Sequence, residues 1–261
     1  MRRMRAMKDH EATILYHVGN HVATITLNRA EKHNSLGLSE LQQLRQRFAE
    51  VNTNERVRVL VLTGAGDRTF CAGAALDQLS SGLISPEMFS GMTTELAGLR
   101  VPTVCSLNGS VYGGGCEVAL SCDFRIGSDS MRAFIPAAKI GLCYPPSGIE
   151  RLVMTMGLAN AQKFLLTANE FKALDLLSMG FLTDSYEPAL VRKEVERLAN
   201  TLATRAPLAV QAMKNISLRS ANRLIDNEQV AAWVSLCNES NDLQEGFLSQ
   251  REKRAAVFTG R

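Results

Sequence analysis

Two short runs rich in β-branched and aromatic residues open the chain. They read "ATILYHV" (12–18) and "HVATITL" (21–27), and Gly19 and Asn20 separate them. A connection of two residues between such runs is typical of a β-hairpin. The sequence therefore predicts that the fold begins with two antiparallel strands.

The next apolar positions recur at helical spacing. Ser39 stands three residues before Gln42, an arrangement that resembles the capping box at a helix N-terminus. One face of the predicted helix would carry Leu41, Leu44, Phe48 and Val51.

Nearly continuous apolar runs then alternate with helical stretches. The run "VRVLVL" (57–62) holds one polar residue, as expected of a strand covered on both faces. Similar runs recur at 102–108 and 123–128, which favours an α/β fold. From about Ala159 the pattern predicts helices only. We divide the chain into a basic tail (1–11), a core (12–195) and a C-terminal helical region (196–261).

Composition and charge narrow the class of protein. Hydrophobic residues make up 46% of the 261 residues and charged residues 21%, which is ordinary for a globular protein. The net charge is +3, but the first eight residues alone carry +4, so the remainder carries −1. This distribution disfavours a nucleic-acid-binding face.

The six cysteines form no C-x-x-C pair, and no His cluster has metal-ligand spacing. No apolar run approaches the roughly 20 residues that span a bilayer. We therefore expect no metal, no membrane partner and a cytoplasmic location.

Two glycine-containing turns are candidates for ligand binding. In the first, Gly64 and Gly66 give the G-x-G of a dinucleotide-binding loop, but Thr69 occupies the third glycine position. No Gly-Lys-Ser/Thr of a phosphate-binding loop is present either. Both nucleotide-binding interpretations are therefore disfavoured.

The turn in "FCAG" and the turn in "YGGGCE" suggest a different function. Small residues let peptide N–H groups approach a ligand closely, and two such donors aimed at one oxygen would stabilise an oxyanion. Glu117 follows Gly114 by three residues, on the same face of a predicted helix. The structural alternatives are that the glycines only allow close packing and that Glu117 only caps the helix.

Five stretches together resemble the crotonase, or enoyl-CoA hydratase/isomerase, superfamily. This resemblance implies a spiral of β-β-α units with a C-terminal helical trimerisation region, assembled as a homotrimer or a dimer of trimers. It also implies an acyl-CoA thioester substrate and no cofactor beyond that coenzyme A. The stretches are "ITLNRAEKHNSL", "VLVLTGAGDRTFCAGAALDQL", "PTVCSLNGSVYGGGCEVALSCDFRI", "IGLCYPPSGIERL" and "EGFLSQREKRAAVF".

The resemblance also assigns roles to particular residues. Ala74 and Gly114 match the two oxyanion donors, and Glu117 matches one of two carboxylates that family hydratases use. The residues that would contact coenzyme A are Lys32, Ala72, Leu76, Lys253 and Phe258.

The chain departs from the family pattern at the second carboxylate. Pro136 is kept, but Ala137 stands where the glutamate would follow it. Loss of this group disfavours classical hydration, which needs an acid and a base. The methylmalonyl-CoA decarboxylase branch has a similar turn and an active-site tyrosine that Tyr144 would match, which makes Tyr144 a second candidate catalytic residue beside Glu117. Ala74 lacks the polar side chain of that branch.

Three alternatives therefore stay open at this point. The enzyme is of the hydratase/isomerase type (a lyase or isomerase of fatty acid metabolism), it is a decarboxylase, or the chain is a non-catalytic acyl-CoA- or RNA-binding relative. Glu150 is a further candidate partner for Glu117, although an exposed acid in the first turn of a helix is its simpler interpretation.

Overall fold

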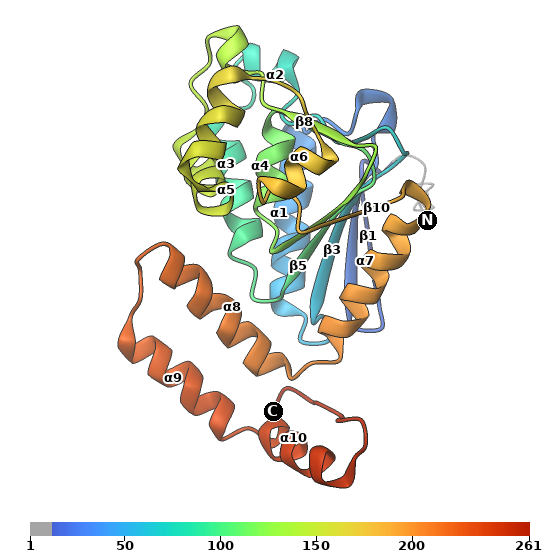
Figure 1. The fold of residues 1–261 in the computed structure, drawn as a ribbon, viewed down its shortest axis with the longest axis vertical. Helices are drawn as coiled ribbons and strands as arrows, with labels where there is room; N and C mark the ends of the chain where they lie inside the picture. The colour runs from blue at the N-terminus through green and yellow to red at the C-terminus, as the bar shows by residue number, and fades with distance from the viewer. Residues whose placement is uncertain (1–11) are drawn as a thin grey trace, which may run out of the picture.

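The computed structural model describes residues 12–261, so the predicted basic tail lies outside the described residues. A six-stranded sheet has the order β1-β2-β3-β5-β7-β10, and a four-stranded sheet has the order β4-β6-β8-β9. Figure 1 shows helices on both sides of the larger sheet and a helical region that extends away from it.

The strands are β1 (Ile14–Gly19), β2 (Val22–Leu27), β3 (Val59–Gly64), β4 (Thr69–Cys71), β5 (Thr103–Leu107), β6 (Ser110–Tyr112), β7 (Phe124–Ser128), β8 (Arg132–Phe134), β9 (Phe171–Lys172) and β10 (Asp184–Tyr186). The helices are α1 (Leu38–Thr53), α2 (Leu76–Ser80), α3 (Pro86–Ala97), α4 (Gly114–Leu120), α5 (Pro146–Thr167), α6 (Ala173–Ser178), α7 (Pro188–Ala203), α8 (Pro207–Ala221), α9 (Asn227–Asn238) and α10 (Asn241–Glu252), with short 3-10 turns η1 (Ala30–Lys32) and η2 (Ala137–Ile140).

The predicted hairpin forms, with its turn one residue later than expected. Gly19 ends β1 and pairs with Val22, so the turn residues are Asn20 and His21. Both have positive φ, 50° and 65°, as a two-residue turn that matches the twist of the strands requires.

Helix α1 also begins differently from the prediction. Its N-cap is Gly37, whose amide donates to the Glu40 side chain at 2.9 Å, so the Ser39–Gln42 pair is not the cap. The predicted apolar face is correct, because Leu41, Leu44, Phe48 and Val51 are all buried.

The strand β3 explains why its sequence is almost entirely apolar. Leu60 and Leu62 point into the main core, while Val59 and Val61 pack in a second core beneath α7. Side chains alternate along a strand, so a sheet covered on both faces needs apolar residues at every position. The predicted α/β class is therefore confirmed.

The chain winds as a spiral between the two sheets. β3, β5 and β7 pair in parallel in the larger sheet, and the strand that follows each one, β4, β6 and β8, pairs in parallel in the smaller sheet. Parallel neighbours end at the same edge. The loops that follow β4 and β6 therefore lie side by side, and both lead into the candidate site.

One expectation for the second half of the chain is corrected. It is not purely helical after Ala159, since β9 pairs with β8 and β10 pairs with β7. The expected domain boundary at residue 195 falls inside α7, whose buried side chains continue to Ala203 against the larger sheet. By packing, α7 belongs with the core.

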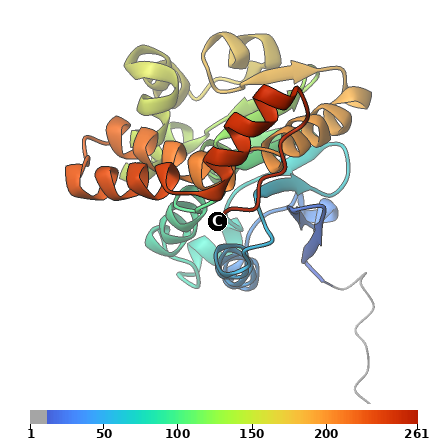
Figure 2. The same cartoon turned by 90° about the horizontal axis from the view of Figure 1, so that it is seen from below.

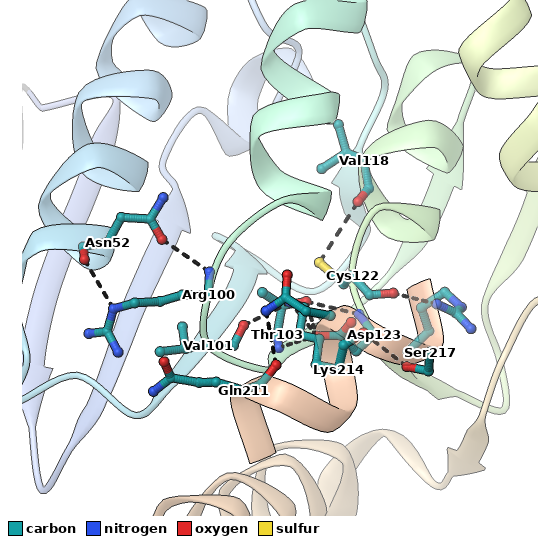
Figure 3. A network of polar contacts seen from close by, with 12 residues as sticks. Asn52, Arg100, Val101, Thr103, Val118, Cys122, Asp123, Gln211, Lys214 and Ser217 are labelled. Atoms are coloured by element: carbon teal, nitrogen blue, oxygen red, sulfur yellow. Dashed lines mark hydrogen bonds and ion pairs between the residues drawn. The ribbon is translucent and has the colours of Figure 1, made fainter. Parts of the chain in front are cut away.

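A polar network ties α8 to the core (Figure 3). The Lys214 ammonium lies 2.7 Å from the Asp123 carboxylate and donates to the Val101 carbonyl at 2.8 Å. The same carboxylate accepts from the Thr103 amide at 2.7 Å and from its hydroxyl at 2.9 Å. Lys214 is thus a buried cation whose partners, Asp123 and Val101, lie in the loops that lead into β7 and β5.

Candidate active site

The turn after β4 and the turn after β6 contact each other closely. A Cβ atom on Gly73 would lie 2.5 Å from the amide nitrogen of Gly114, and Gly73 has a φ of +84°. A Cβ atom on Gly115 would collide with the carbonyl of Cys71. Glycine is therefore required at both positions, by close backbone approach and at Gly73 also by the positive φ.

The contact between the turns leaves two peptide donors available. Leu36 pairs with the chain on either side of Ala74, accepting from the Ala75 amide and donating to the Gly73 carbonyl, but it leaves the Ala74 amide free. Gly114 is the first residue of α4, so its amide has no partner within that helix. Neither amide donates a hydrogen bond within residues 12–261, and both residues are half-buried rather than enclosed.

Glu117 lies on α4 behind this pair of amides, with 1% of its surface exposed. Three donors converge on its Oε1 atom: the Thr93 hydroxyl at 2.8 Å, the Ser147 hydroxyl at 3.2 Å and the Arg151 guanidinium at 3.5 Å. Its Oε2 atom has no hydrogen-bond partner among the described residues. The carboxylate is thus anchored through one oxygen and free at the other.

The three donors come from helices that pack against α4. Thr93 lies on α3, one turn after Phe89, whose ring borders Gly114. Ser147 and Arg151 lie four residues apart on α5 and so share one face of that helix. Burial lowers the pKa of Arg151, and the charge of Glu117 opposes that shift.

Tyr144 is buried beside the same turn. Its hydroxyl donates to the Gly113 carbonyl at 3.1 Å. Burial raises the pKa of the Tyr144 phenol well above its usual value, and the nearby Glu117 charge raises it further. The phenol is therefore neutral at physiological pH and acts as a hydrogen-bond donor that fixes the carbonyl one residue before Gly114.

Ala137 is buried in η2, and the segment that precedes it lies against the glycine turn. Gly113 donates its amide to the Phe134 carbonyl at 3.0 Å, and a Cβ atom on Gly113 would lie 3.9 Å from the ring of Pro136. The side chain at 137 offers no titratable group. Glu150 is exposed, and its neighbour Arg151 is the residue that faces Glu117.

Two buried cysteines lie near the turns. Burial raises the pKa of the Cys71 thiol to about 12 and also raises that of Cys116. Both thiols are therefore protonated near neutral pH and are poor nucleophiles.

The five candidate coenzyme A contacts fall into two groups. Ala72 donates its amide to the His33 carbonyl at 3.0 Å, so the turn after β4 lies beside the segment that carries exposed Lys32. Leu76 begins α2 beside them and is 71% exposed, on the wall of a hollow of about 530 Å³. Lys253 and Phe258 follow α10 at the opposite end of the molecule (Figure 1).

Sequence reasoning missed Thr93, Ser147 and Arg151. The spacing of Ser147 and Arg151 was a usable signal, because residues four apart on a helix share a face. No signal in the sequence linked Thr93 to Glu117, which is 24 residues away.

Among residues 12–261 no group of three or more His, Cys, Asp or Glu side chains is placed to hold a metal ion. None of the helices in this range is both long and apolar enough to cross a bilayer.

The chain winds between two mixed sheets whose central strands are parallel, which is the crotonase fold of its structural neighbours. In this chain the fold places two free amides in front of a buried glutamate. The profile of the enoyl-CoA hydratase/isomerase family matches residues 17–261. The chain belongs to this family, which confirms the prediction made from the sequence motifs.

Individual relatives agree with this assignment over almost their full lengths. The (E)-benzylidenesuccinyl-CoA hydratase of Thauera aromatica is 31% identical over 93% of this chain and 97% of its own. The short-chain-enoyl-CoA hydratase of Clostridium acetobutylicum is 30% identical over 90% and 89%. The crystal structure of enoyl-CoA hydratase from Bacillus anthracis superposes with a TM-score of 0.87 at 27% identity, covering 96% of this chain and all of that one.

Proposed function

We propose that the protein acts on an acyl-CoA thioester by stabilising its enolate. The amides of Ala74 and Gly114 would bind the thioester carbonyl oxygen, and the N-terminus of α4 would add its positive dipole. Glu117 would then move a proton at the α- or β-carbon. The observation that carries this proposal is the free Oε2 of a buried glutamate, one helical turn behind a free amide.

The proposed reaction is of the enoyl-CoA hydratase/isomerase type, with Glu117 as the proton carrier. One carboxylate suffices for isomerisation, in which the same group takes a proton from one carbon and returns it to another. Hydration would need Glu117 to serve both the water and the α-carbon in a concerted transfer, because Ala137 supplies no second group.

Decarboxylation of a malonyl-type thioester is the second candidate. It requires the oxyanion hole for the enolate but no activation of water, so the alanine at 137 favours it specifically. Glu117 would in this case supply the proton that replaces the lost carboxylate. A non-catalytic acyl-CoA- or RNA-binding role is less well supported, because burying a carboxylate among three donors has no evident use in binding alone.

The role that best fits Tyr144 is to orient the proposed oxyanion hole, the pair of amides of Ala74 and Gly114. Its hydroxyl holds the Gly113 carbonyl, which belongs to the peptide unit that ends in the Gly114 amide. We therefore treat Tyr144 as a positioning residue for the donor and leave proton transfer to Glu117.

We further propose that Lys32, Ala72 and Leu76 contact coenzyme A in one chain, while Lys253 and Phe258 do so from a neighbouring copy. A homotrimer or a dimer of trimers would supply that copy. Support comes from the C-terminal helices and their connections, which leave large apolar side chains exposed: Met213, Leu224, Ile225, Val234, Leu236 and Phe247.

A turnover panel tests the proposed chemistry. The protein is incubated with enoyl-, 3-hydroxyacyl- and methylmalonyl-CoA, and the products are weighed by mass spectrometry. Gain or loss of water indicates hydratase chemistry, loss of carbon dioxide indicates decarboxylation, and isomers of unchanged mass are separated by chromatography. Tight binding of these thioesters without any turnover would overturn the proposal in favour of a non-catalytic relative.

Light scattering tests the proposed assembly. A monomer at micromolar concentration would contradict both the trimer and the contribution of Lys253 and Phe258 from a neighbouring copy. The cytoplasmic location expected from the sequence stays a prediction.

A further inference from the structure

The hydroxyl of Thr93 has two acceptors but only one proton to donate. Its Oγ1 atom lies 2.8 Å from Oε1 of Glu117 and 3.0 Å from the carbonyl oxygen of Ser90, one turn earlier on α3. Thr93 is fully buried, so water does not compete for either contact. The hydroxyl can therefore donate to one oxygen or to the other by rotating about a single bond.

The charge of Glu117 decides which acceptor is the stronger one. When Glu117 is ionised, Oε1 carries negative charge and attracts the hydroxyl proton more strongly than a neutral carbonyl does. When a proton resides on Oε2, Oε1 becomes an uncharged oxygen, and the hydroxyl can turn to Ser90 without losing a hydrogen bond. Neither state leaves a buried donor without an acceptor.

The other two donors do not share this property. The Arg151 guanidinium can only donate, and it also reaches the Thr93 carbonyl at 3.3 Å. The Ser147 hydroxyl contacts Oε1 alone among the described residues, at the longer distance of 3.2 Å. Thr93 is thus the short contact to the carboxylate and the one with an alternative acceptor inside its own helix.

We propose that Thr93 is a positioning residue that fixes Oε2 of Glu117 as the oxygen that takes and returns the proton, while its own hydroxyl switches between Oε1 and Ser90. This inference rests on the function proposed above. It explains how one carboxylate would alternate between base and acid in a site where alanine replaces the second one.

The proton transfer balances within the site. The C–H bond at the α-carbon breaks, its electron pair forms the carbon–carbon double bond of the enolate, the π pair of the carbonyl moves to its oxygen, and the proton joins Oε2. The resulting enolate oxygen accepts from the Ala74 and Gly114 amides. Return of the proton from Oε2 to carbon restores the carboxylate, and the Thr93 hydroxyl turns back to Oε1.

Deuterium exchange at the α-carbon of butyryl-CoA follows this proton transfer without hydration, isomerisation or decarboxylation, and it includes exchange of the Oε2 proton with solvent. The full-length protein is incubated with butyryl-CoA in deuterium oxide, and deuterium incorporation is followed by mass spectrometry at saturating thioester. Calorimetry gives the Kd of butyryl-CoA for each variant, and thermal melts report folding. We compare Thr93→Val, which keeps the branched shape without the hydroxyl, with Thr93→Ser, which keeps the hydroxyl.

We expect Thr93→Val to lower the saturating exchange rate by about 10-fold or more, the scale of one hydrogen bond to a charged group. The Kd should stay within about twofold, since the hydroxyl contacts the carboxylate and not the thioester. Thr93→Ser should recover most of the rate. Thr53→Val is the matched control, because the Thr53 hydroxyl bonds only to its own helix, at Ala49 and Glu50.

Three results would overturn the inference. They are a wild-type exchange rate in Thr93→Val, a folded Thr93→Ser that exchanges as slowly as Thr93→Val, or a Thr93→Val variant that binds butyryl-CoA more weakly but exchanges at the wild-type rate when saturated. If Thr93→Val does not fold, Thr93→Ala takes its place in the comparison with Thr93→Ser, and a wild-type exchange rate in Thr93→Ala would contradict the inference. Absence of exchange in the wild type would instead remove the proposed function itself, and the inference with it.

Discussion

Helices α4 and α9 differ in what surrounds them, and the difference separates the two parts of the molecule. Six of the seven residues of α4 are buried, including Glu117, whereas α9 has no buried residue. The core therefore specifies the candidate site within one chain. The C-terminal helices are attached to the core by a few polar contacts, which we call tethers: Lys214 with Asp123, and Arg58 with the Phe258 carbonyl. Figure 2 shows α8 and α9 extending side by side beyond the core.

The tethers differ from the core contacts in kind as well as in number. Around α4 the backbone of two turns packs so closely that side chains are excluded at Gly73 and Gly115. The C-terminal region is instead attached by charged side chains, with Lys214 of α8 on Asp123 and Arg58 donating to the Phe258 carbonyl at 2.8 Å. Changes in the core should therefore affect catalysis, and changes in the tethers should affect stability and assembly.

The largest effect is expected from Gly73→Ala. A methyl group there would meet the Gly114 amide nitrogen at 2.5 Å, and the residue would have to keep a φ of +84°. Displacing one donor of an oxyanion hole costs about 10²–10³-fold in kcat, so turnover should fall by that amount while Kd for the thioester changes less. Steady-state kinetics on the substrate identified by the panel measure it.

Gly91→Ala is the matched control for this prediction. Gly91 lies within α3, next to the site elements, but a Cβ atom there would have nothing within 4 Å. It should keep wild-type turnover. Equal losses in the two variants would mean that the close contact between the turns does not matter for the chemistry.

The next effect in size is expected from Glu117→Gln. The amide keeps the volume of the side chain but cannot accept the proton, so kcat should fall by about 10² or more while acyl-CoA affinity is retained. Glu150→Gln is the control, because Glu150 is exposed on the adjacent helix. Unchanged turnover in Glu117→Gln would remove this residue from the mechanism.

The sequence predicted those residues of the candidate site that lie in short motifs, and it missed those that only the packing of helices brings together. The proposed donors Ala74 and Gly114 lie in turns that contain glycine, and Glu117 follows in the first turn of α4, so short sequence motifs pointed to all three. Thr93 and Arg151 reach Glu117 only because α3 and α5 pack on α4. The spacing of Ser147 and Arg151 places those two residues on one helix face, but nothing in the sequence linked that face or Thr93 to Glu117, so the link required the tertiary fold.

The fold was predicted best where the pattern was long and periodic. The apolar face of α1 was identified from its helical spacing, and β3 was identified from a nearly continuous apolar run at 57–62, two residues before its observed bounds. The short strands β9 and β10, of two and three residues, were missed because so few residues show no alternation. The turn at Asn20 and His21 was misplaced by one residue because Gly19, a typical turn residue, ends the strand instead.

Lys214→Met should mainly affect stability. The substitution keeps an unbranched apolar stem but removes the charge that contacts Asp123 and the hydrogen bond to Val101. We expect a loss of about 1.5–3 kcal/mol in the free energy of unfolding, the scale of a hydrogen bond to a charged group. Chemical denaturation measures this, with exposed Lys193→Met as the control. A tenfold loss of kcat with intact stability would contradict the separation of the two regions.

The smallest effect is expected from Ala137→Glu, which tests whether alanine marks a lost second carboxylate. Ala137 is buried, and the segment before it lies against the glycine turn. The family resemblance places the second carboxylate at this position, so we expect a glutamate there to enter the same site as Glu117. Hydration of crotonyl-CoA should rise severalfold at most, because a transplanted side chain lacks neighbours that fix its rotamer, and misplacement by about 1 Å can cost 10²-fold.

Burial of two carboxylates in one site should also raise the pKa of one of them, which suits an acid and a base that work together. The measurement is kcat/KM for crotonyl-CoA in wild type and variant, with thermal melts to check folding and Ala138→Glu as the neighbouring control. Residue 138 follows in the same 3-10 turn but is exposed, so a carboxylate there should leave hydration unchanged. If the wild type is already a fast hydratase and Ala137→Glu is slower, then alanine at 137 does not mark the loss of a second catalytic carboxylate. The second proton transfer would then have to come from Glu117 itself, which is the behaviour that the two acceptors of Thr93 are suited to support.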